Sequence, residues 1–170
     1  MRTPSGNVVA YDVEAETAHH GSAEIAGRAL VWTVGAEPPE GGTELLAADV
    51  DLDDTVPWLM RCDRVDFQPG GIAHRHVHPG PGIRCLLFGS ITIETQGATH
   101  DYGPGEPWFE TGPDPVLATT SPDEPSAFVR VLLLPSEWEG KRTISYVDPA
   151  DAGKPKTQRA TIFLERPLRP

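Results

Sequence analysis

The residues of this chain best suited to chemistry are three histidines in one short stretch: His74, His76 and His78 alternate with Arg75 and Val77. Alternation predicts a β-strand, in which residues two apart point to the same face. We therefore expect the three imidazoles to share a face, with neighbouring rings roughly 6.5–7 Å apart. Imidazole binds divalent transition metals, and two neighbouring rings can converge on one ion. Three in a row span about 13 Å, so a third ligand must come from another segment.

The histidines must be positioned by a strand that ends at a tight turn. Pro79-Gly80-Pro81-Gly82 follows them directly, and such a sequence cannot continue a central strand. An apolar run over residues 83–88 then predicts a second strand, which Gly89 closes. The sequence thus predicts a strand, a turn and a second strand, with histidines gathered on one face.

This unit resembles the first sequence motif of the cupin family. Gly70, His76, His78 and Gly89 have the spacing of that motif, while Gly82 stands where the family has a glutamate. The resemblance implies that His76 and His78 are metal ligands and that the glutamate ligand is absent.

The second cupin motif is recognisable only as a strand, a turn and a strand after Gly105. Counting from Gly105, Thr111 and Pro113 stand at the proline and glycine positions, and Val116 stands at the position of the family's ligand histidine. The two motifs cover residues 65–118. The resemblance implies a double-stranded β-helix, which is a jelly-roll barrel, with one small-molecule pocket and a homodimeric assembly.

Composition independently favours an all-β fold with few helices. The 170 residues include 17 glycines and 18 prolines, which separate many short β-rich runs. We expect a single domain over residues 1–170, with a core at about 28–134, an N-terminal arm over 1–27 and a C-terminal extension over 135–170. Within that extension, residues 160–164 predict an additional edge strand.

Charge and apolar patterning exclude several partners. The net charge of −11, with no basic stripe, argues against nucleic acid and against anionic membranes. No apolar run approaches the roughly 18 residues that a membrane-spanning helix needs, and the first residues do not resemble a signal peptide. Cys62 and Cys85 are expected to be reduced thiols, so we predict a cytoplasmic protein.

Glu110 is the best candidate for the third metal ligand. It lies five residues after Gly105, on the strand expected opposite the histidines. Two histidines and one carboxylate with open positions form the arrangement used by non-haem iron oxygenases. His74 is the next candidate, and His100 is the third. The cofactor would be a divalent transition metal such as Fe, Zn, Ni or Mn.

Arg84 is expected to share the inward face of the second strand. A guanidinium inside a barrel is costly unless it is paired. Arg84 therefore either pairs with Glu110 or anchors a substrate carboxylate, unless it faces outward.

Three classes of function stay open. The first is a metal-dependent enzyme, oxygenase- or isomerase-like, acting on a small organic acid or a secondary metabolite, with Glu110 and Arg84 as catalytic residues. The second is a metal-free cyclase or isomerase in which His76, His78 and Glu110 act as acid and base. The third is a non-catalytic module that binds a small molecule.

Overall fold

The computed structural model describes residues 1–36 and 38–169. Within this part of the chain there are thirteen β-strands, and the only helical segments are two 3₁₀ turns, η1 at Ser136–Trp138 and η2 at Pro149–Gly153. The predicted all-β class with few helices is confirmed.

Two five-stranded antiparallel sheets form the barrel. The first sheet has the order β13-β4-β11-β6-β9, and the second has the order β12-β5-β10-β7-β8. The first comprises β4 (Trp58–Phe67), β6 (Gly82–Phe88), β9 (Pro107–Glu110), β11 (Ser126–Pro135) and β13 (Gln158–Pro167). The second comprises β5 (Ile72–Val77), β7 (Ile91–Thr95), β8 (Ala98–Tyr102), β10 (Val116–Thr120) and β12 (Ser145–Tyr146).

The two sheets face each other across a shared apolar core. Alternation in β7 turns Ile91 and Ile93 inward, where they pack with Phe67 and Leu86 of the opposite sheet. The architecture is therefore the predicted double-stranded β-helix.

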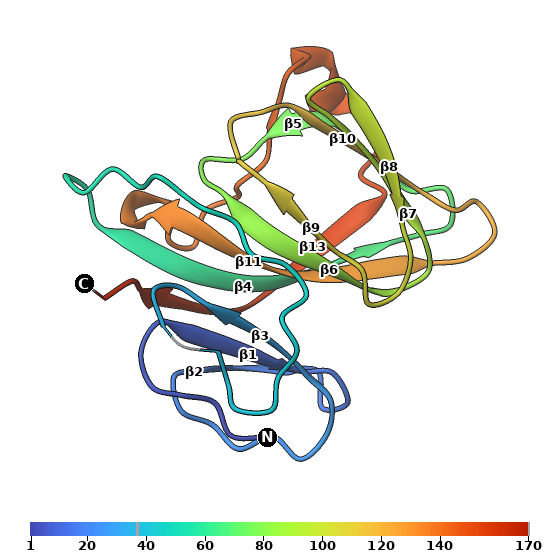
Figure 1. Cartoon of the computed structure of the whole chain (residues 1–170). Helices are drawn as coiled ribbons and strands as arrows, with labels where there is room; N and C mark the ends of the chain where they lie inside the picture. Colours follow the sequence, from blue (N-terminus) through green and yellow to red (C-terminus); the bar gives the residue numbers. More distant parts are fainter. Residues whose placement is uncertain (37, 170) are drawn as a thin grey trace.

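The N-terminal residues form a third layer outside the barrel. Strands β1 (Val8–Asp12), β2 (Thr17–His20) and β3 (Ala29–Thr33) make a separate sheet with the order β2-β1-β3. Val9 and Tyr11 are fully buried against Met60 and Val129, on the outer face of the first barrel sheet. Figure 1 shows this small sheet below β4 and β11. Because β11 is covered on both faces, residues 126–134 are all buried.

The domain subdivision expected from the sequence differs from the observed strand order. Residues 29–33 lie in the outer sheet and not in the barrel, and residues 8–12 and 17–20 form strands where only an arm was expected. At the other end, β13 pairs with β4 along its length, which confirms the edge strand predicted at residues 160–164. The barrel strands consequently extend from residue 58 to residue 167, because the last strand is recruited by pairing with a strand far away in sequence.

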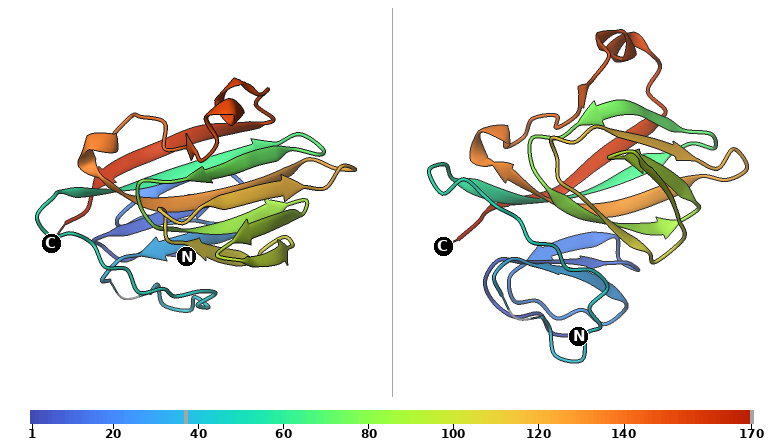
Figure 2. Two further views of the ribbon diagram at one scale, coloured as in Figure 1. Left: turned by 90° about the horizontal axis from the view of Figure 1, so that it is seen from above. Right: turned by 45° about the horizontal axis from the view of Figure 1, so that its top comes forward.

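The segment between β11 and β13 connects the edges of the two sheets. Its strand β12 pairs with β5, and the chain then passes through η2 to β13 (Figure 2). None of the helices that the structure describes is long and apolar enough to span a membrane. The cytoplasmic location and the homodimer stay predictions.

Candidate functional site

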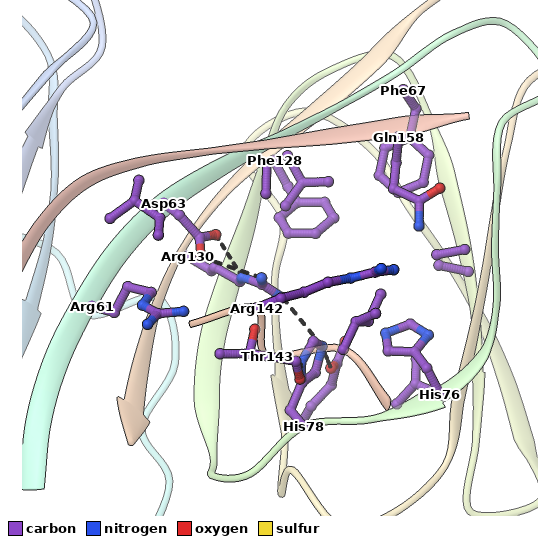
Figure 3. A pocket seen from close by; sticks show the side chains of 18 of the residues that line it. Arg61, Asp63, Phe67, His76, His78, Phe128, Arg130, Arg142, Thr143 and Gln158 are labelled. Carbon is purple, nitrogen blue, oxygen red and sulfur yellow. Dashed lines mark hydrogen bonds and ion pairs between the residues drawn. The ribbon is translucent and has the colours of Figure 1, made fainter. Parts of the chain in front are cut away.

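A cavity of about 340 Å³ lies between the two sheets, and the segment after β11 forms part of its wall. Its apolar lining consists of Val65, Phe67, Ala73, Ile93, Trp108, Val116, Ala118, Phe128, Ile144, Ala160 and Ile162. Its polar lining includes His76, His78, Asp63, Glu110 and Arg130 (Figure 3). A mostly apolar cavity of this size with a few converging polar groups is suited to one small organic molecule.

His76 and His78 lie side by side on the cavity wall, as the sequence predicts. Both are nearly fully buried, and their ring centroids are 4.9 Å apart in an edge-to-face arrangement. His76 Nδ1 lies 2.7 Å from the His74 carbonyl oxygen, and His78 Nδ1 lies 2.9 Å from that of Thr143. A carbonyl oxygen only accepts, so both Nδ1 atoms carry the hydrogen and both Nε2 atoms present a lone pair.

Burial keeps these imidazoles neutral. Desolvation lowers the pKa of His76 below its usual 6.5 and lowers that of His78 well below it. The nearby Arg130 guanidinium adds to the lowering of the His78 pKa. A neutral imidazole can accept a proton or bind a cation at Nε2 where no other group donates to that lone pair.

His74 does not share the face of the other two histidines, and this prediction was wrong. Opposite β5, Val116 pairs with His76 and Ala118 pairs with Ala73, so β5 holds one residue more than β10 between these positions. The extra residue forms a β-bulge, which breaks the two-residue alternation. Ala73 therefore lines the cavity with His76, while His74 contributes its carbonyl oxygen and no ring.

A buried chain of charge-assisted hydrogen bonds ends at His78. Arg130 Nε donates to Asp63 Oδ1 at 2.6 Å and Nη2 donates to Oδ2 at 3.2 Å. Arg130 Nη1 donates to His78 Nε2 at 3.2 Å. Figure 3 shows this line from Asp63 through Arg130 to His78. The carboxylate fixes the guanidinium, and the guanidinium occupies the lone pair of His78.

Asp63 and Arg130 were missed in the sequence, although a signal existed. Arg130 is the one charged residue in the apolar run of β11, and Asp63 is one of four charged residues in β4; both side chains are almost completely buried. A charge in such a run predicts a partner. The sequence does not say which partner, because that depends on the register of β4 against β11.

Glu110 also points into the cavity, and Arg84 lies behind it. Arg84 Nη2 is 2.6 Å from Glu110 Oε2, while the Trp108 indole N–H donates to Oε1 at 2.9 Å. Arg84 is fully buried and is not part of the cavity wall, and burial lowers its pKa to about 10. Of the two inward roles expected for Arg84, the structure supports pairing with Glu110, whereas the substrate-anchor role would need contact with the cavity.

As placed, the donor set is one ligand short of a metal site. Among the described residues, no three His, Cys, Asp or Glu side chains are arranged to hold an ion. Glu110 Oε2 is 3.9 Å from His78 Nε2 but is paired with Arg84. Arg130 already donates to His78, and two guanidinium groups near the imidazoles would repel a divalent cation.

The two departures from the cupin motifs lie where a metal ligand would be needed. Val116 stands directly across from His76 and lines the cavity with an apolar side chain. Gly82 pairs with Glu110 on one side and Leu132 on the other. His100, the third candidate ligand, is exposed on β8 and does not line the cavity.

No protein-family model and no curated protein sequence matches the chain. Among solved structures, the polyketide cyclase RemF from Streptomyces resistomycificus is similar, with 22% identity and a TM-score of 0.42, over 56% of this chain and 64% of that one. A cupin-superfamily sugar phosphate isomerase from Silicibacter pomeroyi matches with 20% identity and a TM-score of 0.37, over 42% and 48% of the two chains. An RmlC-like cupin from Shewanella frigidimarina matches with 10% identity and a TM-score of 0.40, over 53% of this chain and 94% of that one.

The matched parts span less than two thirds of the first two chains, and at these identities the likeness concerns the fold alone. The strand order, with the motif spacing from Gly70 to Gly89, independently points to the same architecture. The double-stranded β-helix that the resemblance to the cupin family implies is confirmed by this strand order.

Proposed function

We propose that this protein is an acid–base enzyme that needs no metal, of the cyclase or isomerase type. Its substrate would be a small, largely apolar carbonyl compound, and its reaction would begin with removal of a proton from the carbon next to the carbonyl. One observation carries this proposal: the same apolar cavity is lined by the neutral His76, whose Nδ1–H is held by a carbonyl, and by the Arg130 guanidinium, which is fixed by Asp63.

His76 is the proposed general base. Its Nδ1–H is held by the His74 carbonyl, so Nε2 is the atom that accepts the proton from carbon. In an isomerisation, the same atom then returns the proton to a different position of the substrate. In a cyclisation, the carbanion first attacks a second carbonyl group and closes a ring, and Nε2 then gives the proton to the oxygen of that carbonyl. The lowered pKa keeps the base unprotonated at neutral pH.

Arg130 is the proposed stabiliser of the oxygen on which negative charge develops. Three of its five N–H groups donate to Asp63 and His78, which leaves two for a substrate oxygen. Asp63 holds the guanidinium in place, so little reorganisation is needed during the reaction. His78 and Glu110 also belong to the polar wall of the cavity.

Hydrogen–deuterium exchange tests this proposal without knowledge of the natural substrate. A panel of 1-indanone, 1-tetralone and 2-tetralone is incubated with the protein in D₂O, and loss of the α-proton signals is followed by NMR. We expect faster exchange with the native protein and a reduction of about 10²–10⁴-fold in His76→Gln. His100→Gln, an exposed histidine outside the cavity, is the matched control. Absence of accelerated exchange for every ketone would overturn the proposal.

The pH profile separates His76 from other bases. The acid limb of the exchange rate should lie below 6.5, because burial lowers the pKa of this histidine. An acid limb above that value would exclude His76 as the base.

A metal-dependent oxygenase- or isomerase-like enzyme is the second candidate. It is favoured by the orientation of His76 and His78, since ligand histidines usually have Nδ1–H held by a carbonyl or a carboxylate. Glu110 would be the third ligand, and it would have to leave Arg84. Metal content decides between the two candidates, while tight ligand binding without any turnover would indicate a non-catalytic binding module.

A further inference from the structure

The cavity wall carries more positive charge than its catalytic groups require. Five cationic side chains line it against two carboxylates, Asp63 and Glu110. The cations are Arg61, Arg130, Lys141, Arg142 and Lys156.

Ion pairing inside the protein accounts for only part of this charge. Arg61 pairs with Glu165, Arg130 pairs with Asp63, and Glu110 is neutralised by Arg84 from behind. Lys141, Arg142 and Lys156 have no carboxylate within ion-pair distance among residues 1–36 and 38–169, which contrasts with the net charge of −11 of the whole chain.

Two of these cations are gathered around one aromatic ring. Lys156 Nζ lies 4.4 Å from the centroid of the Tyr146 ring, and Arg142 Cζ lies 5.5 Å from it. Arg142 Nη2 also donates to the Tyr146 hydroxyl at 3.1 Å, and Lys156 Nζ donates to the carbonyl oxygens of Asp151 and Ala152. Two positive charges close to a single ring stabilise an anion that binds near it.

This cluster adjoins the proposed base. Tyr146 pairs with His76 across the β12–β5 edge, so the cations lie one strand away from the base. In Figure 3 the Arg142 side chain extends across the pocket, with Phe128 and Gln158 on one side and His76 and His78 on the other. If the anionic group of a ligand binds here, the rest of that ligand lies among the apolar side chains of the cavity.

We propose that Arg142 and Lys156 form an anion-binding subsite, and that the substrate of the proposed enzyme carries a carboxylate or an ionised phenol on an apolar body. The inference rests on the proposed function and names its substrate class. The guanidinium fork of Arg142 can bind a carboxylate through two hydrogen bonds. The apolar body then lies against Phe67 and Phe128, with its reactive carbon near His76. The local positive charge also attracts an anion that the rest of the acidic chain repels.

Binding of matched probes tests the subsite. The probes are benzoate, 2-naphthoate and 2-anthroate, each compared with its neutral primary amide, by calorimetric titration of the full-length protein. We expect the best carboxylate to bind about tenfold or more tightly than its amide, and this preference to shrink at high salt.

Variants that remove single charges show which residues cause the preference for carboxylates. Arg142→Gln and Lys156→Gln should each weaken carboxylate binding by about three- to tenfold, and the double variant should abolish the preference over the amide. Both residues are exposed, so the barrel is expected to fold. Arg159→Gln is the control, because Arg159 is exposed on β13 and does not line the cavity. The proposal is overturned if no carboxylate binds more tightly than its amide, or if the double variant keeps the preference.

The failure of this inference and that of the proposed reaction are distinguishable. His76→Gln should lose ketone exchange and retain the preference for carboxylates. A preference for carboxylates without any ketone exchange would refute the proposed reaction and support the anion subsite. Ketone exchange without a preference for carboxylates would support the proposed reaction and refute the anion subsite.

Discussion

Arg130 and Asp63 stand directly opposite each other in the β11–β4 pairing and are joined by two hydrogen bonds of 2.6 and 3.2 Å. The pair lies on the cavity wall, and Arg130 is the only charged residue of β11. A buried ion pair contributes little to stability by itself, but it holds the guanidinium at one place in the cavity. Its position beside His78 gives the apolar barrel a fixed positive charge where a reacting oxygen can bind.

Breaking this pair should destabilise the protein strongly. Asp63→Asn leaves a buried guanidinium without its counter-charge, which we expect to lower the free energy of unfolding by about 3–5 kcal/mol in urea titrations. Asp66→Asn is the matched control in the same strand, because its pair with Arg64 is partly exposed, and it should change stability by about 0.5 kcal/mol or less. Equal effects of the two variants would show that the Asp63 pair is not important for stability.

A neutral replacement of the same pair should separate stability from function. Asp63→Leu combined with Arg130→Met removes both charges, and only His78 Nε2, on the cavity wall, loses its donor. We expect its free energy of unfolding to match or exceed that of the native protein. Ketone exchange, however, should fall by about 10²-fold or more, because the stabilising cation is lost. Full exchange activity in this folded double variant would exclude a role for Arg130.

Metal analysis should give a low metal content. Protein purified without a histidine tag is expected to hold far less than one Fe, Zn, Ni or Mn ion per chain by plasma mass spectrometry, since the described residues include no group of three His, Cys, Asp or Glu side chains arranged around an ion. Ketone exchange should persist after treatment with a chelator. About one ion per chain, lost in His76→Ala/His78→Ala with the barrel still folded, would instead support the metal-dependent enzyme.

Packing around Gly82 should exclude any side chain there. A Cβ atom at this position would lie 2.4 Å from the Val131 carbonyl oxygen and 2.8 Å from Leu132 Cδ2. Gly82→Ala should therefore lower the free energy of unfolding by about 1–3 kcal/mol in urea titrations. Gly153→Ala, where the added methyl group meets nothing within 4 Å, should have little effect. Similar stability of the two variants would mean that the strand adjusts easily and that a glutamate could be accommodated.

Stability should decrease as the pH falls through 6.5. Burial lowers the pKa values of His76 and His78 in the folded state, so the unfolded chain binds protons at a higher pH than the folded protein does. Between the folded and unfolded pKa values the free energy of unfolding then falls by up to about 1.4 kcal/mol per pH unit for each histidine. Urea titrations from about pH 7.5 to pH 5 measure this slope. His76→Gln/His78→Gln should flatten it, and an unchanged slope would mean that other groups cause the pH dependence.

The amino-acid sequence by itself determined the fold class and the central pair of histidines. Local alternation predicts strands, and Pro/Gly turns predict where they end, because both depend only on neighbouring residues. The spacing from Gly70 through His76 and His78 to Gly89 was sufficient to predict the barrel and the strand that carries the imidazoles.

Only the tertiary structure decided which other side chains join them. The bulge in β5 removes His74 from the cavity, and the register of β4 against β11 places Asp63 next to Arg130. The segment after β11 brings the Thr143 carbonyl to His78 and the Arg142 guanidinium to the cavity wall. These relationships join residues up to 67 positions apart in the chain. They depend on strand pairing across the whole barrel, which no local pattern of residues specifies.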